Sequence, residues 1–256
     1  MYLGINKPKL VKSVIRPRYS VITISLDEVA SVSRTADSIV GQDYSNFEWI
    51  VIDGGSVDGT LEELRRYRSD ISYLVSEPDG GIYDAMNKGL QYARGEYVIF
   101  MNAGDRFASS DVLAAVDAAL KSDLLVGSLD MIGSDQIRSF PKVLPGNYLL
   151  KNMLPHQSTF FRRGLFKEFG FFDTSYRIAG DYEMFARLIQ SGKVSYEYLD
   201  KTIAIFDAGG VSSDKKLRQL RKRENHKVRW RYFKKYRFSL KGIRQQVRNL
   251  LFSASY

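Results

Sequence analysis

The chain has 256 residues, 44% hydrophobic and 26% charged, which suits one or two globular domains with a sizeable core. It contains no cysteine, which excludes disulfides, thiolate metal ligands and cysteine nucleophiles. No apolar run approaches the roughly 18–20 residues that span a bilayer, and residues 1–18 lack the continuous apolar stretch of a signal peptide. We therefore expect a cytoplasmic protein.

The net charge of +9 is unevenly distributed along the chain. Residues 215–256 hold 15 Lys and Arg and one acid, Glu224, and residues 1–18 hold five basic residues and no acid. Between them lie 18 basic and 28 acidic residues. This argues against nucleic acid as a ligand of the acidic body and favours anionic partners for the basic ends. We expect a basic N-terminal segment, a main domain and a basic tail, at residues 1–18, 19–213 and 214–256.

Apolar runs and helical periodicity alternate along the first half of the main domain. The β-rich runs, which predict strands, are residues 19–25, 47–52, 71–76 and 96–101. Apolar residues at three-and-four spacing predict helices at residues 29–40, 61–67, 82–93 and 111–121. This alternation is typical of βαβ units, so we predict an α/β fold with a parallel sheet covered by helices on both faces.

Three successive predicted strands end in glycine-rich loops that carry an acid, at Asp53, Asp79 and Asp105. Right-handed crossovers bring such strand ends to one edge of the sheet, where α/β proteins bind ligands. Asp53 can accept hydrogen bonds from a ribose or base, and Asp105 can hold a divalent cation that binds a diphosphate. Each acid alone is equally typical of a turn, but their convergence favours a nucleotide crevice. The chain has no glycine-rich dinucleotide motif or P-loop, so a diphosphate would need the cation.

Two motifs carry a resemblance to a known family. With DGGSVDGT at residues 53–60 and NAGD at residues 102–105, the chain resembles family 2 inverting glycosyltransferases of GT-A fold over residues 19–213. The 14-residue string SEPDGGIYDAMNKG at residues 76–89 is similar to enzymes of bacterial exopolysaccharide assembly, especially those of the colanic acid cluster. The resemblance implies a Rossmann-like, mostly parallel sheet. It also implies transfer of a sugar, with inversion, from a UDP- or GDP-sugar to a saccharide hydroxyl.

The resemblance further implies roles for single residues. They are nucleotide binding for Ser25, Asp53, Asp79 and Asn102, binding of Mg²⁺ or Mn²⁺ for Asp105, the catalytic base for Asp181, and the acceptor or diphosphate side for His156 and Glu183. The chain departs from the family pattern in two places. Gly104 stands where the metal motif commonly has a further acid, and Asp27 stands where the family often has Asn.

An inverting displacement needs one base to deprotonate the acceptor, whereas a double displacement needs a second carboxylate as nucleophile. Asp181 begins a predicted amphipathic helix, residues 181–189, where an acid is also expected simply as an N-terminal cap. Glu183 is the second candidate for the base. His156 follows Pro155 and precedes a β-rich run, so a purely structural role is the alternative to a contact with diphosphate or acceptor.

The tail carries an apolar stripe, with apolar residues every three or four positions. The stripe consists of Trp230, Phe233, Tyr236, Leu240, Ile243, Val247 and Leu250. We expect the helix to be interrupted near residues 238–239 and at Gly242. Most basic residues lie off this stripe, which predicts a basic amphipathic helix at an anionic membrane surface. The enzyme would then lie on the inner face of the bacterial membrane and act on a lipid-linked acceptor. Docking of the stripe on the main domain or on a second subunit is the alternative, and the oligomeric state stays open.

Two other function classes fit parts of the chain. A sugar nucleotidyltransferase uses a similar sheet but needs a phosphate loop rich in Gly, Arg or Lys after the first strand, and the sequence there is LDEV at residues 26–29. A non-catalytic membrane- or nucleic-acid-binding module explains the basic tail. It does not explain three acids at strand ends in an acidic body.

Overall fold

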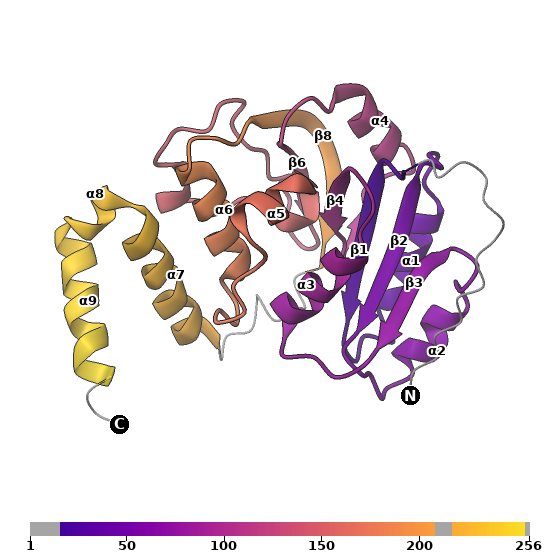
Figure 1. Cartoon of the computed structure of the whole chain (residues 1–256), viewed down its shortest axis with the longest axis horizontal. Coiled ribbons are helices and arrows are strands. Elements are labelled where there is room, and N and C mark those ends of the chain that lie inside the picture. Colours follow the sequence, from indigo (N-terminus) through magenta and orange to yellow (C-terminus); the bar gives the residue numbers. More distant parts are fainter. Residues whose placement is uncertain (1–15, 208–216, 254–256) are drawn as a thin grey trace.

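The computed structural model describes residues 16–207 and 217–253, with side chains described as far as residue 247. One eight-stranded sheet forms the centre, with strand order β3-β2-β1-β4-β7-β6-β8-β5 (Figure 1). The strands are β1 (Tyr19–Ser25), β2 (Phe47–Asp53), β3 (Ile71–Ser76), β4 (Tyr97–Phe100), β5 (Arg106–Phe107), β6 (Leu124–Met131), β7 (Thr159–Arg162) and β8 (Tyr196–Phe206).

Helices cover both faces of this sheet. They are α1 (Val32–Val40), α2 (Thr60–Arg65), α3 (Ile82–Tyr92), α4 (Val112–Ala119), α5 (Gly164–Phe169), α6 (Gly180–Gln190), α7 (Arg218–Tyr232), α8 (Lys234–Arg237) and α9 (Leu240–Ser253), with 3-10 turns η1 (Tyr148–Leu150) and η2 (His156–Ser158). Apolar residues of α1, α2 and α4 form the core on one face, and those of α3, α5 and α6 form the core on the other.

The first half of the chain folds as the alternating pattern predicts. Strands β1, β2, β3 and β4 are parallel, with β1 at the centre of this half and buried along its whole length. Helix α3 lies very close to β1, because a Cβ atom on Gly89 would be 2.5 Å from the side chain of Ile22. Glycine is therefore the residue that fits this contact. The carboxyl ends of β1, β2, β3 and β4 meet at one edge, which confirms the predicted α/β architecture.

The second half of the sheet is mixed. Strand β7 runs antiparallel to both β4 and β6, while β8 is parallel to β6 and antiparallel to β5. The two-residue strand β5 follows Asp105 directly and pairs with β8, a contact between segments about a hundred residues apart that no local pattern announces. The mostly parallel sheet that we expected thus describes only the first half. In the second half the antiparallel strands are β7 and β5, and β5 begins directly after Asp105.

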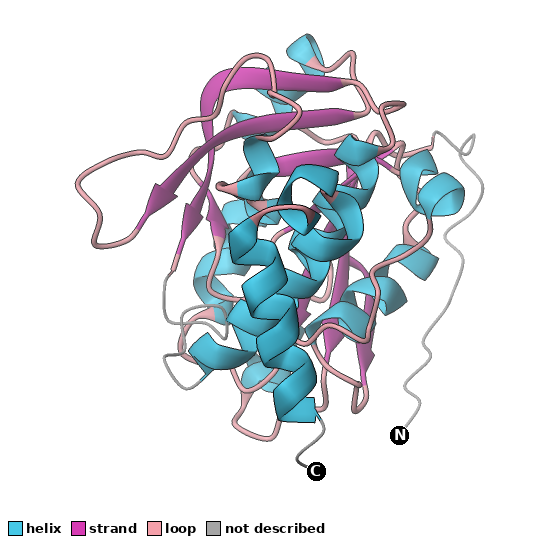
Figure 2. Cartoon of the chain, turned by 90° about the vertical axis from the view of Figure 1, so that its left-hand side faces the viewer, coloured by secondary structure: helices cyan, strands magenta, loops and turns pink. Residues whose placement is uncertain are grey.

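The tail is divided between the core and the surface. Helix α7 packs on α6, and Val228 and Phe233 are buried in the same core as Phe185. Figure 2 shows the last helix, which ends near the label C, on the side that faces the viewer. Helix α9 folds back on α7, where the ring of His226 is hydrogen-bonded to Tyr236 and Gln246 at 2.9 Å each. None of the helices in the described ranges combines the length and apolarity that crossing a bilayer requires.

The apolar stripe is therefore not one continuous helix. The chain breaks at Phe233, which the sequence did not indicate, and again at residues 238–239, where we expected an interruption. Gly242 lies inside α9 and does not interrupt it; a Cβ atom there would be 2.1 Å from the carbonyl oxygen of Tyr236. Phe233 and Tyr236 of the stripe pack on the core of the protein. Leu240 of the stripe and Phe238 at the break stay exposed, at 74% and 78%.

Candidate active site

Asp53 ties together the ends of three strands. Its carboxylate accepts hydrogen bonds from the hydroxyls of Ser25 (3.1 Å), Ser56 and Ser76 (2.6 Å), and from the backbone N–H groups of Gly55 (3.2 Å) and Ser56 (3.0 Å). A carboxylate has about four lone-pair directions, so these five bonds saturate it. Asp53 is fully buried and holds β1, β2 and β3 in register at the edge of the crevice.

The side chain of Asp79 lies against the loop after β2, at Gly54. Its Oδ1 accepts the backbone N–H of Gly81 at 2.8 Å, and its Oδ2 would be 2.7 Å from a Cβ atom on Gly54. Only a glycine at position 54 leaves room for this approach. The structure thus brings together Ser25, Asp53 and Asp79, which the sequence assigned to the nucleotide.

Asn102, His156 and Asp181 form a second cluster on the other side of β1. The Nδ2 atom of Asn102 lies 3.2 Å from Nε2 of His156, and Nδ1 of His156 lies 3.4 Å from Oδ2 of Asp181. When the Asn102 amide donates to Nε2, the proton of a neutral imidazole sits on Nδ1 and is donated to Asp181. Three segments that are far apart in the sequence therefore form one hydrogen-bonded chain.

Tyr83 of α3 adds a fixed donor to this cluster. Its hydroxyl lies 2.6 Å from the carbonyl oxygen of Ile178 and 3.2 Å from Oδ1 of Asp181. Burial raises the pKa of Tyr83 well above its ordinary value, so the hydroxyl stays protonated and available as a donor. Its single proton is shared between these two acceptors, and Oδ1 of Asp181 also accepts the backbone N–H of Tyr182 at 2.7 Å. Tyr182 and Tyr83 thus hold one oxygen of the Asp181 carboxylate, and His156 lies against the other.

Asp105 is buried beside this cluster, with 5% of its surface exposed. Burial raises its pKa to about 7, although His156 and hydrogen bonds from the Asp207 backbone and the Gln157 side chain act in the opposite direction. The loop is anchored because the hydroxyl of Thr35 donates to the carbonyl oxygen of Asp105 at 2.6 Å. The ionised form of a carboxylate that is buried from solvent is stabilised when a cation lies next to it.

Asp105 and Asn102 offer oxygen atoms, which is the type of ligand that a hard divalent cation takes. Asn102 Oδ1 is buried and finds no hydrogen-bond partner within the described ranges, so it is an unused acceptor on the same turn as Asp105. The described residues contain no group of three or more His, Cys, Asp or Glu side chains arranged around a metal. One carboxylate and one amide oxygen leave positions for water and substrate phosphates, which is how Mg²⁺ is commonly held.

The comparison with known proteins decides the family. A family model described as "Glycosyl transferase family 2" matches residues 20–175, more than half of the chain. The chain belongs to glycosyl transferase family 2. An uncharacterized glycosyltransferase of Mycobacterium tuberculosis is 38% identical over 67% of this chain and 68% of its own. A "PGL/p-HBAD biosynthesis glycosyltransferase" of Mycobacterium bovis is 31% identical over 77% of this chain and 80% of its own.

Solved structures share the fold. TarS 1–349 of Staphylococcus aureus, in complex with UDP-GlcNAc, superposes with a TM-score of 0.66 at 18% identity over 84% of this chain and 67% of its own. The mannosyltransferase PcManGT of Pyrobaculum calidifontis, in complex with GDP-Man and Mn²⁺, superposes with a TM-score of 0.62 at 24% identity over 88% and 67%. Both confirm the GT-A architecture of this family 2 glycosyltransferase, a curled mixed sheet flanked by helices.

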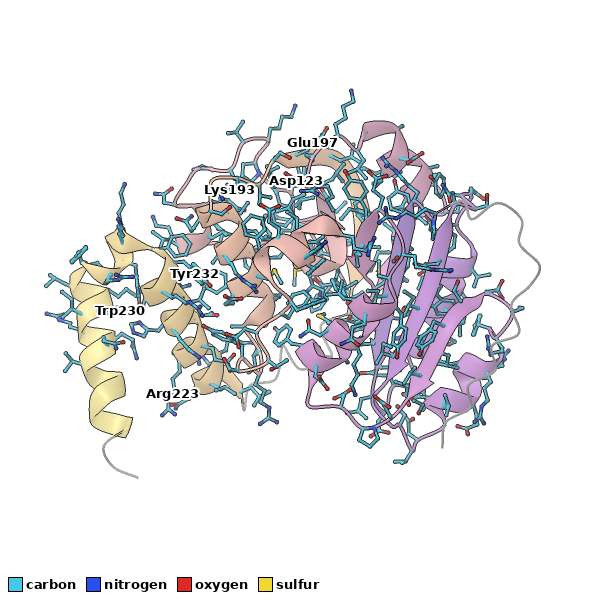
Figure 3. The ribbon with its side chains drawn as sticks, viewed as in Figure 1. Asp123, Lys193, Glu197, Arg223, Trp230 and Tyr232 are labelled. Carbon is cyan, nitrogen blue, oxygen red and sulfur yellow. The ribbon has the colours of Figure 1, made fainter. Side chains whose placement is uncertain are left out.

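Glu183 does not join the other candidate residues. Its carboxylate accepts hydrogen bonds from Arg187 (2.8 Å) and from the hydroxyl of Tyr232, which lies between α7 and α6 (Figure 3). Residues two apart on a helix point in different directions, so Asp181 faces His156 while Glu183 faces α7. The geometry contradicts the assignment of Glu183 to the acceptor side and its use as a second base.

The structure also places the two residues for which the sequence left a structural alternative. The N-cap position of α6 is Ala179 rather than Asp181, but Oδ1 of Asp181 accepts the backbone N–H of Tyr182 at 2.7 Å in the first turn. Both ring nitrogens of His156 lie against other candidate residues, Asn102 and Asp181. The sequence assigned no role to Tyr83 or Gln157 as partners of the acids, although Tyr83 lies inside the string at residues 76–89 and Gln157 directly follows His156.

Gly104 departs from the metal motif for a conformational reason. Its φ angle is 98°, in the left-handed region that an aspartate adopts only with strain. Asp27 has a φ of 54°, which Asn and Asp tolerate better than other residues with a side chain. The backbone thus gives a reason for glycine at position 104, whereas Asn would fit the conformation of Asp27 equally well.

Proposed function

We propose that this glycosyltransferase transfers a sugar from a nucleotide-diphosphate sugar to a hydroxyl group of a saccharide acceptor, with inversion at the anomeric carbon. The observation that carries the proposal is the chain Asn102–His156–Asp181, which sets one buried carboxylate opposite the loop that bears Asp105. The complexes of TarS with UDP-GlcNAc and of PcManGT with GDP-Man support a UDP- or GDP-sugar as donor.

Ser25, Asp53 and Asp79 bind the nucleoside in this proposal. Asp53 is saturated by its own loops, so a ribose or base contact replaces one of the serine hydroxyl bonds rather than filling an open acceptor. The exchange of one hydroxyl donor for another has little net cost. Asp79, at the rim of the loop after β3, lies next to the same position.

Asp105 and Asn102 would hold Mg²⁺ or Mn²⁺. When bound, the cation offsets the negative charge that develops on the leaving diphosphate. The protein supplies one carboxylate oxygen and one amide oxygen, and His156 keeps the Asn102 amide turned so that Oδ1 faces away from the imidazole. Phosphate oxygens of the donor would complete the ligand set, so metal and donor would bind together.

Asp181 acts as the base in this proposal. It takes the proton of the acceptor hydroxyl while the bond between the anomeric carbon and the diphosphate breaks and the bond to the acceptor oxygen forms. Tyr83 and His156 hold its carboxylate in place. Such a base contributes about 10²–10⁴-fold. A single base suffices for inversion, and Glu183, the next acid on α6, faces α7.

We further propose that the acceptor is lipid-linked and that the enzyme works at the inner face of a bacterial membrane, in exopolysaccharide assembly. The exposed apolar residues of α9 and of the turn before it support this, because they lie among basic residues that attract anionic lipids. The apolar ones are Phe238, Leu240, Ile243 and Val247. The basic ones are Lys234, Lys235, Arg237, Lys241 and Arg244.

A donor screen tests the proposal. Thermal unfolding is measured with a panel of UDP- and GDP-sugars, each with and without Mg²⁺ or Mn²⁺. A true donor at 100 times its dissociation constant should stabilise the protein by about 2.7 kcal/mol. The product is then examined by NMR, and inversion appears as the opposite anomeric configuration. Retention of configuration, release of pyrophosphate as by a nucleotidyltransferase, or no stabilisation by any nucleotide sugar would contradict the proposal.

A further inference from the structure

Glu224 is the only acidic residue within residues 215–256, and it lies on the buried side of α7. Its side chain is buried, and its carboxylate accepts three consecutive backbone N–H groups, those of Arg177 (2.8 Å), Ile178 (2.9 Å) and Ala179 (2.9 Å). A buried charge has to be compensated, and three N–H dipoles that converge on one carboxylate do so.

The three N–H groups belong to the segment that leads into α6. Ala179 is the N-cap of α6, and its own side chain makes no capping bond. The carboxylate of Glu224, on another helix, binds the N–H of this N-cap residue and adds negative charge at the N-terminus of α6, whose first turn also carries Asp181 and Glu183. Asp181 follows two residues later, at the start of α6.

Tyr83 contacts residues 177–180 from the side opposite Glu224. The Tyr83 hydroxyl binds the carbonyl oxygen of Ile178, while Glu224 binds the N–H of the same residue. Gly180 lies flat against the Tyr83 ring, because a Cβ atom there would be 2.7 Å from it. Tyr83 also contacts Oδ1 of Asp181, so a shift of the segment changes the direction of that carboxylate.

We infer that Glu224 is a positioning residue for Asp181, and that α7 thereby belongs to the catalytic unit rather than to a separate tail. The inference rests on the proposed function, in which Asp181 is the base. It reaches beyond the residues that the family model matches, because both Asp181 and Glu224 lie outside 20–175. Glu224 touches no reacting atom; it acts on the backbone that carries Asp181.

Three variants of the full chain test the inference. Glu224→Gln keeps the size of the side chain but loses the charge and turns an N–H group toward the three donors. We expect kcat to fall about 10- to 100-fold while the KM for donor stays within about twofold, as for a misplaced base. Glu224→Asp retains the carboxylate and should keep more of kcat than Glu224→Gln. Val228→Ala, a buried change on the same helix, lowers the melting temperature but should leave kcat unchanged.

Amide hydrogen exchange separates this inference from the proposed function. In Glu224→Gln, the amides of residues 177–179 should exchange faster than in wild type, and Val228→Ala should leave them protected. Wild-type kcat or unchanged exchange in Glu224→Gln would overturn the inference while an inactive Asp181→Asn leaves the proposed base standing. Full activity of Asp181→Asn would instead remove the proposed base, and the catalytic part of this inference with it.

Discussion

The Nδ1 atom of His156 lies 3.4 Å from Oδ2 of Asp181. The two residues come from a 3-10 turn before β7 and from the first turn of α6, and His156 in turn reaches Asn102 on the loop after β4. A movement of Asn102 on the donor-binding loop would therefore shift the His156 ring and, through it, the carboxylate of Asp181.

Asp181→Asn should lower kcat by about 10²–10⁴-fold and leave the KM for donor nearly unchanged, because the base acts only in the transition state. Steady-state kinetics with the identified donor measure both constants. The matched control is Glu183→Gln, an acid-to-amide change on the same helix. A kcat loss in Glu183→Gln as large as in Asp181→Asn would contradict the assignment of the base.

Glu183→Gln itself should act on stability. The Glu183 carboxylate is buried between Arg187 and Tyr232, so its loss leaves a guanidinium and a hydroxyl less well paired. We expect a decrease of about 1–3 kcal/mol in the free energy of unfolding. Denaturant unfolding measures it, with the exposed Glu168→Gln as the control that should show no change.

Asp105→Asn should stabilise the metal-free protein at neutral and alkaline pH. The folded-state pKa of Asp105 is about 7, above its ordinary 3.8, so ionising it disfavours the folded state increasingly as the pH rises from about 4 to about 7. The variant removes this cost, which we put at about 1–4 kcal/mol above pH 7. The melting temperatures of variant and wild type should converge near pH 4 and separate by pH 8.

The same variant should lose the joint stabilisation by donor and Mg²⁺ or Mn²⁺, because the carboxylate ligand is gone. Thermal unfolding with donor, with metal and with both distinguishes the cases. Asp111→Asn, an exposed acid at the start of α4, is the control that should keep the effect. Undiminished metal dependence in Asp105→Asn would place the cation elsewhere.

Gly104→Asp restores the acid of the family motif, yet we expect no tighter metal binding. At a φ of 98° any side chain strains the backbone, although the space around a Cβ atom is open, with the nearest atoms at 3.8 Å and 3.9 Å. Gly104→Asp and Gly104→Ala should therefore both lower the free energy of unfolding by about 1–2 kcal/mol. A Gly104→Asp variant that is as stable as wild type and binds metal more tightly would refute this account.

Membrane binding should depend on the exposed end of the tail. In the full chain, Phe238→Ser combined with Leu240→Ser should release the protein from anionic vesicles, and rising salt should weaken wild-type binding. Val57→Ser, an exposed apolar residue on the loop after β2, is the control. Deletion of the tail is a poor test, because Val228 and Phe233 belong to the core. Undiminished vesicle binding by the double variant would exclude this surface.

Much of the fold was readable from local patterns. The four parallel strands and the helices between them were predicted within a few residues, because a buried strand and an amphipathic helix each leave a short-range periodicity. The acids at the ends of β2 and β4 were found for the same reason, since strand ends follow from the strands. The family was readable from the strings at residues 53–60, 76–89 and 102–105.

Only the tertiary structure decided which acids can act together. Asp181 and Glu183 are alike in sequence, but packing turns one toward His156 and the other toward Tyr232. Asp53 looked like an open ligand and proves to be saturated by three serines and a loop. Glu224 looked like a stray acid in a basic tail and proves to hold the segment before Asp181. These contacts join residues 23 to 49 positions apart in the sequence. A short-range periodicity cannot encode such a pairing, because the pairing depends on how helices and strands pack against one another.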